Sequence, residues 1–390
     1  MHFSHFHRRL WSVLLAMVMV FSAVVPAMAA EDHSESGQAD TLFWEKIDNS
    51  AFSAPSPFRE ELAAEDLTQS YADTDEVRVA IVLEDASTLE EGFTSDQVAA
   101  CNAGAMDYRA SLEEKQVEME DAISEQVLHG DALDVVWNLT LAANMISANV
   151  TYGQIAQIAA LPGVKEVLIE NRYDPCVLDQ QEVTDPLMST SGEMIGSDIA
   201  WAEGYTGAGT RIAVIDSGLD VDHPSLDPDA LKYALQGSNA TIMTEADLTD
   251  EVLNQLNAYT RKAGLTAADF YVNEKIPFGF NYVDADTDIT HDNDTQGDHG
   301  SHVTGIAAGN RFVKDEAGNY VAALDSVMTQ GVAPDAQILT MKVFGKGGGA
   351  YDSDYMVAIE DAVMLGCDAV TLSLGSGNAG FTTPDAKYQS

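Results

Sequence analysis

The chain has 390 residues, of which 46% are apolar, and this length is sufficient for two or three domains with a sizeable core. Its formal net charge is −44, because 63 acidic residues are set against only 19 Lys and Arg. A surface with this charge repels nucleic acid and anionic lipid, so neither is an expected partner. The charge bears on solubility and carries no information about the fold.

The N-terminus has the pattern of a secretory signal peptide. Arg8 and Arg9 precede an apolar run over 10–25, and the small-x-small sequence Ala27-Met28-Ala29 follows it. A membrane anchor is the alternative, but a run of about 16 residues is shorter than the ~20 needed to cross a bilayer. We therefore predict that residues 1–30 are removed on export. The mature protein is then secreted or attached to the cell envelope, with no membrane partner.

The three cysteines, Cys101, Cys176 and Cys367, are too few and too scattered for a disulfide framework. The sequence contains no Cys-x-x-Cys pair, which argues against a structural zinc site. Cys367 lies in an apolar, strand-like context and is interpreted as a small core residue.

The first regular elements follow an acidic, proline-interrupted stretch over 31–76, which predicts a flexible leader. Four strands and two helices are then predicted: strands at 77–83, 132–141, 145–150 and 164–169, and helices at 105–128 and 152–161. The order strand-helix-strand-strand-helix-strand is that of a ferredoxin-like split β-α-β unit. Residues 77–172 are therefore predicted to form an α+β domain.

A second domain is predicted over 194–390, after an aperiodic stretch at 173–193 that we interpret as an exposed linker. Apolar, β-branched strands are predicted at 211–215, 338–344 and 369–374, with a helix at 354–365 between the last two. A strand, a crossover helix and a further strand imply an α/β domain, in which helices flank a parallel sheet.

Asp216 is the first candidate for chemistry. It follows the predicted strand 211–215 and precedes a turn that contains Gly218. In a parallel sheet, working groups gather at the carboxyl ends of the strands, so Asp216 is placed to hold a partner His in one tautomer. The alternative is a turn-forming Asp that caps a loop.

His299 is the second candidate, because it opens a predicted helix of small residues that runs to Gly309. A His that acts as a general base must be held rigidly, within about 2.6–3.2 Å of its nucleophile. Two alternatives are a metal site formed by Asp298, His299 and His302, and a structural pair of His. The metal site is disfavoured because metal-binding helices usually place their His at i and i+4 with an intervening Glu.

Four segments resemble, in order, the successive sequence blocks of subtilisin-like serine proteases: 212–220, 299–309, 331–344 and 367–375. The likeness is greatest to lactocepin-type cell-envelope proteinases. In these, a Met-Lys-Val-Phe block leads through a Gly-rich loop to Ala-Ile-Glu-Asp and then Leu-Ser-Leu-Gly, as at 341–375 here. The unit at 77–172 is similar to the inhibitor-type propeptide of the same family.

The resemblance implies a subtilisin-like α/β fold and a role for each candidate residue. Asp216 would orient the base, His299 would be the base, and His302 would be a structural neighbour. Protein or peptide substrates would bind as an added β-strand. The flanking residues would be Gly347, Gly348, Gly349, Ser373, Leu374 and Gly375. Taken alone, Gly347 to Gly349 would be interpreted as a flexible turn, and Ser373 to Gly375 as the end of a strand.

The resemblance also implies that the chain's own propeptide is a partner in cis, which blocks the cleft until it is cut within 173–193. The chemistry would require no cofactor. The segment between Asp216 and His299 is longer than in many relatives, and its surplus, about 231–297, is expected to be an extra loop near the cleft. This loop is rich in Asp, so a structural calcium ion is an open alternative, although the spacing matches no EF-hand. In addition, Ser225 stands where many relatives carry a calcium-ligating Asp.

The blocks that carry the family's oxyanion Asn and its nucleophilic Ser do not occur in residues 1–390, which contain no Gly-Thr-Ser sequence. Acyl transfer by a triad requires both groups. We therefore expect the N-terminal part of a secreted serine endopeptidase, inactive on its own. The alternative is a naturally truncated, non-catalytic protein that inhibits or chaperones other subtilases.

Overall fold

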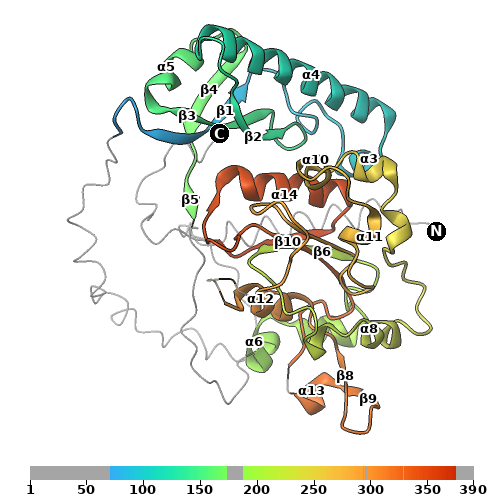
Figure 1. The fold of residues 1–390 in the computed structure, drawn as a ribbon. Coiled ribbons are helices and arrows are strands. Elements are labelled where there is room, and N and C mark those ends of the chain that lie inside the picture. Colours follow the sequence, from blue (N-terminus) through green and yellow to red (C-terminus); the bar gives the residue numbers. More distant parts are fainter. Residues whose placement is uncertain (1–70, 174–187, 293, 295–296, 328, 375–390) are drawn as a thin grey trace, which may run out of the picture. The chain divides into compact units, whose positions relative to one another are not determined.

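The computed structural model describes residues 71–173, 188–292, 294, 297–327 and 329–374 (Figure 1). The predicted signal peptide, almost all of the leader, most of the linker, Cys176 and Gly375 lie outside the described residues. Cys101 and Cys367 are free, partly buried thiols. No described helix is long and apolar enough to cross a bilayer.

The first half of the described chain is built on an antiparallel sheet. Its strands are β1 (Glu76–Leu83), β2 (Asp134–Leu139), β3 (Met145–Thr151) and β4 (Val164–Ile169), in the order β2-β3-β1-β4. The helices are α3 (Ser95–Ala99), α4 (Ala103–Gln126) and the short η2 (Tyr152–Gln154) and α5 (Ile155–Ile158). This arrangement confirms the predicted split β-α-β unit.

Alternation along β1 explains how this unit forms its core. Val79 and Ile81 point to one face of the sheet and are fully buried against Ile123 of α4 and Ile158 of α5. The unit begins earlier than predicted, because the ring of Tyr71 stacks on Tyr152 with 5.3 Å between the ring centroids. The last residues of the predicted leader therefore belong to the folded unit.

The second half is built on a parallel sheet, which confirms the predicted α/β class. Its strands are β6 (Arg211–Asp216), β7 (Phe278–Asn281), β10 (Gln337–Lys342) and β12 (Ala369–Leu372), in the order β12-β6-β10-β7. All three pairings are parallel. Every residue of β10 is buried, as expected for a central strand covered on both faces.

The remaining elements connect and flank this sheet. They are β5 (Arg172–Tyr173), α6 (Met188–Ile195), α7 (Ser197–Ala202), η3 (Pro224–Leu226), α8 (Pro228–Ala234), η4 (Glu245–Asp247), α9 (Asp250–Leu253), α10 (Asn257–Arg261), α11 (Ala267–Phe270), α12 (His299–Ala308), β8 (Phe312–Lys314), β9 (Tyr320–Ala322), α13 (Ala323–Ser326), β11 (Ala350–Tyr351) and α14 (Asp352–Met364). The predicted linker 173–193 is therefore shorter, because its first residue belongs to β5 and its last six belong to α6.

The expectation that 231–297 is an extra loop is wrong in part, because this segment contributes a strand to the parallel sheet. β7 pairs with β10, and its Phe278 and Phe280 are fully buried. Phe270 of α11 stacks on Phe278 at 5.3 Å between ring centroids. β7 was not predicted, because an alternating pattern over only four residues is too short to be recognised in the sequence.

Lys275 fixes this segment to the base of β10. Its side chain is fully buried, and its Nζ donates hydrogen bonds to the carbonyl oxygens of Pro334 (3.0 Å) and Ala336 (2.8 Å). Burial lowers the pKa of Lys275 to about 7. The segment is thus held by a buried polar anchor as well as by aromatic packing.

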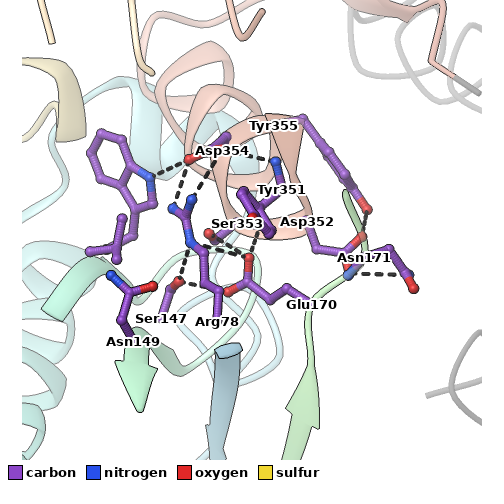
Figure 2. Close-up of polar contacts among 12 residues, drawn as sticks. Arg78, Ser147, Asn149, Glu170, Asn171, Tyr351, Asp352, Ser353, Asp354 and Tyr355 are labelled. Atoms are coloured by element: carbon purple, nitrogen blue, oxygen red, sulfur yellow. Dashed lines mark hydrogen bonds and ion pairs between the residues drawn. The ribbon is translucent and has the colours of Figure 1, made fainter. Parts of the chain in front are cut away.

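Helix α14 contacts both sheets, β2 of the first and β6 of the second (Figure 1). Its carboxylates bind the first unit directly. Asp354 accepts two hydrogen bonds from the guanidinium of Arg78 (2.8 and 3.3 Å) and one from the indole of Trp137 (2.9 Å). In return, Glu170 accepts hydrogen bonds from the backbone and hydroxyl of Ser353 (3.1 and 2.8 Å; Figure 2). The two units are therefore joined by buried carboxylates, each of which accepts hydrogen bonds from the other unit.

Candidate active site

The carboxyl end of β6 and the start of α12 bring the two predicted catalytic residues together. The Nδ1 of His299 lies 2.7 Å from Oδ1 of Asp216, and the two residues are 7% and 1% exposed. Because a carboxylate can only accept a hydrogen bond, Nδ1 carries the proton. In the neutral ring, Nε2 is therefore unprotonated and can accept a proton, and this is the tautomer that a general base needs.

Backbone contacts hold Asp216 in this position. Its carbonyl oxygen accepts from the N–H of Val343, just after the neighbouring strand β10, at 2.9 Å. Its Oδ1 also accepts from the N–H of Ser217 at 2.7 Å. The other oxygen, Oδ2, is buried and has no hydrogen-bond partner among the described residues. One carboxylate oxygen thus both fixes the turn and orients the imidazole.

Close approach of two backbones positions α12 against this turn. A Cβ on Gly300 would lie 2.6 Å from the carbonyl oxygens of both Ser217 and Gly218. Two hydroxyls complete the contact, since Ser217 Oγ accepts from the N–H of Gly300 (2.9 Å) and Ser301 Oγ accepts from the N–H of Asp220 (2.7 Å). Glycine at 300 is therefore required for His299 to reach Asp216. The two hydroxyls had not been singled out in the sequence, although both lie inside the matching blocks.

We expect Gly300→Ala to lower the free energy of unfolding by about 1–3 kcal/mol, because the added methyl overpacks the contact between α12 and β6. Gly305→Ala is the matched control in the same helix, since a Cβ there would meet no atom within 4 Å. That variant should be neutral or stabilising by up to about 1 kcal/mol. Urea unfolding of both variants measures the difference, and equal effects would contradict the role given to Gly300.

A buried ion pair lies beside the Asp–His pair and was also missed from the sequence. Lys342 stands opposite Asp216 in the register of β10 and β6. Its Nζ lies 2.6 Å from Oδ2 of Asp294, both side chains being fully buried, and it donates to the carbonyl oxygen of Thr290 at 2.9 Å. This lysine therefore ties the segment before α12 to the central strand. In the sequence, the only sign of this ion pair is a Lys at the end of an apolar strand.

The predicted substrate-binding residues fall into two places. The hydroxyl of Ser373 lies 3.5 Å from Nε2 of His299, and the neighbouring Leu374 is partly buried. Gly347, Gly348 and Gly349 instead precede β11. A Cβ on Gly349 would lie 2.5 Å from Nε of Arg172, in β5. The structure thus brings Ser373 to the imidazole and places the glycine segment beside β5, while Gly375 lies outside the described residues.

The described residues include no group of three or more His, Cys, Asp or Glu arranged to hold a metal ion. His302 is exposed, one helical turn from His299. In the acidic segment, Asp286 and Asp288 face Nζ of Lys346 at 3.8 and 3.5 Å. The ammonium group of Lys346 therefore faces both carboxylates.

Part of the chain is similar in sequence to a known protein family. Residues 207–390 match the model of the subtilase family, peptidase S8. The PI-type proteinase of Lactococcus lactis subsp. cremoris is 31% identical over 293 residues, which is 72% of this chain and 13% of that protein. The minor extracellular protease Vpr of Bacillus subtilis (strain 168) is 28% identical over 234 residues, covering 57% of this chain and 22% of that protein.

A solved structure, that of the epidermin leader peptide processing serine protease from Staphylococcus aureus, is 16% identical to this chain. The match covers 77% of this chain and 50% of that one, with a TM-score of 0.37. The chain spans between about an eighth and a fifth of the two relatives above. The matched region contains both Asp216 and His299. Residues 207–390 of this chain therefore belong to the subtilase family.

Proposed function

We propose that this chain is the N-terminal portion of a secreted serine endopeptidase that hydrolyses proteins or peptides. The observation that carries the proposal is the buried contact of 2.7 Å between Asp216 and His299, which leaves Nε2 as the unprotonated nitrogen of the neutral imidazole, able to take a proton. In the reaction, His299 removes the proton of a serine hydroxyl as that oxygen attacks the scissile carbonyl, and Asp216 stabilises the imidazolium that forms. The chemistry requires no cofactor.

We further propose that residues 77–172 act as an inhibitory propeptide in cis. The supporting contact is β5, which begins at the last residue of this unit and pairs antiparallel with β11, next to Gly347–Gly349. An extended segment that adds a strand at this edge occupies the place of a substrate backbone. Removal of residues 1–30 on export, followed by a cut within 173–193, would then release the cleft.

The nucleophile is proposed to come from coding sequence beyond Ser390, because residues 1–390 contain no Gly-Thr-Ser block. The test is secretion of the chain with any coding sequence that follows Ser390, assayed on casein and with a serine-directed fluorophosphonate. We expect casein cleavage, labelling of one serine and a new N-terminus within 173–193. Secreted, folded protein that neither cleaves nor reacts would contradict the proposal.

That last outcome would instead favour a non-catalytic inhibitor or chaperone of other subtilases. This second function is supported by the contact between the first unit and α14, which Asp354 and Glu170 form. The first unit could bind another protease through the same surface. Inhibition of a separate subtilase by the secreted protein would distinguish the two functions.

A further inference from the structure

Residues 244–262 give the first unit a third contact, in addition to those with α14 and β11. They lie between β6 and β7 and contain η4, α9 and α10. Part of the contact is apolar, because Leu256 of this segment and Val98 of α3 are fully buried in the same hydrophobic cluster. The rest is polar and involves Arg109 and Trp137 of the first unit.

Arg109 reaches from α4 to the backbone of this segment. Its Nη1 donates hydrogen bonds to the carbonyl oxygen (2.5 Å) and the side-chain oxygen (3.3 Å) of Gln255. Within its own unit, its Nε donates to Oγ1 of Thr140 at 3.0 Å. Arg109 is only 4% exposed, and a buried guanidinium is costly unless acceptors satisfy it. Arg109 therefore depends on an acceptor outside the first unit.

Arg261 of α10 makes the reciprocal contact with β2 of the first unit. Its Nη1 donates to the carbonyl oxygen of Val136 at 3.1 Å, and its guanidinium lies over the ring of Trp137, 4.8 Å from the centroid. Trp137 is 4% exposed. Each side thus donates from one arginine to the backbone of the other. Arg and Trp are among the residues that most often dominate the binding energy of protein interfaces.

Helix α14 holds this segment in place, and α10 lies beside it (Figure 1). Asp361 of α14 accepts hydrogen bonds from the backbone N–H of Asn257 (2.7 Å) and of Ala258 (2.9 Å). It also accepts from the hydroxyl of Tyr282 at 2.9 Å. These three donors all lie outside the first unit, so α10 keeps this anchor when the first unit leaves. The segment is therefore a preorganised surface, which reduces the entropic cost of binding.

We propose that residues 244–262 are a docking surface for the first unit, which they recognise through Arg109 and Trp137. The inference rests on the proposed role of the first unit as an inhibitory propeptide, and it adds the surface that selects the inhibitor. The partner that fits is an α+β unit that presents an arginine to Gln255 and a tryptophan to α10. Changes in this surface should therefore weaken inhibition and leave the hydrolysis of small peptides unaltered.

Hydrogen exchange on the full chain tests the docking surface without requiring activity. Arg109→Met keeps an apolar stem and removes the donors to Gln255, so we expect exchange of the α10 amides, across the contact, to accelerate about tenfold or more. Lys115→Met is the matched control, because this exposed lysine of α4 pairs with Asp85 of its own unit. Equal exchange of α10 in the two variants would overturn the inference.

Arg261→Met keeps the test decisive if Arg109→Met does not fold, because Arg261 is exposed. We expect the amides of β2, on the opposite side of the contact, to exchange about threefold faster, the factor that an exposed cation–π contact contributes. Lys262→Met changes the next position, which is also exposed, and should leave these amides unaffected. The surface would be ruled out by β2 exchange that is the same in both variants.

The time course of activation tests the consequence for inhibition. Hydrolysis of casein by the secreted protein is followed from the cut within 173–193 onward. We expect Arg261→Met to shorten the lag before hydrolysis about threefold, with kcat/KM on a small fluorogenic peptide unchanged once the first unit has left. A lag equal to that of the parent would overturn the inference and leave the peptidase standing. If nothing is cut or cleaved, the proposed function fails, and the exchange experiments still decide whether the surface binds the first unit.

Discussion

Replacing His299 with alanine is expected to lower kcat/KM for peptide hydrolysis by the proposed peptidase about 10⁴-fold. The imidazole is the only base within hydrogen-bond distance of Asp216 in the described chain, and a serine hydroxyl is a poor nucleophile without one. Asp216→Asn should cost a similar factor, because an amide can donate to Nδ1 and so favours the wrong tautomer. Hydrolysis of a fluorogenic peptide measures both.

His302→Ala is the matched control for these variants. His302 lies in the same helix, one turn away, and its side chain is exposed. Its replacement should leave kcat/KM within about threefold of the parent protein, a shift well below one kcal/mol. Loss of activity in His302→Ala equal to that in His299→Ala would contradict the assignment of the base, as would activity above a tenth of the parent in His299→Ala.

Glu360→Ala is expected to have the largest effect on folding, lowering the free energy of unfolding by about 3–5 kcal/mol. Glu360 is fully buried in α14, and its carboxylate accepts from the backbone N–H of Leu141 (2.7 Å) and Ala142 (2.8 Å) in the first unit. Alanine would leave the buried N–H of Leu141 and the partly buried N–H of Ala142 without this acceptor, and an orphaned buried donor costs about 1–3 kcal/mol. Urea unfolding gives the total effect.

Two further measurements make this prediction specific. Exchange of the Leu141 and Ala142 amides should accelerate in Glu360→Ala before the rest of the first unit opens, because these amides lose their acceptor directly. Glu125→Ala, at an exposed position of α4, should change the free energy of unfolding by less than about 0.5 kcal/mol. Unchanged protection of the two amides in Glu360→Ala would show that the carboxylate does not hold the first unit.

The sequence determined several of the longer regular elements and the two candidate catalytic residues. Alternation over 77–83 predicted β1, and helical spacing predicted α4 and α14, because periodicity is a local property of the chain. Asp216 was found at the end of an apolar strand and His299 at the start of a helix of small residues. Both are local signals, and the order of the blocks around them indicated the family.

The tertiary structure alone decided which of the other polar groups meet. Nothing in the sequence near Lys342 indicates that its partner is Asp294, or that Glu360 binds amides more than two hundred residues away. β7 became recognisable as a core strand only through its pairing with β10. A buried charge takes whichever partner the fold brings within reach, and that choice depends on the packing of distant segments, which local periodicity does not encode.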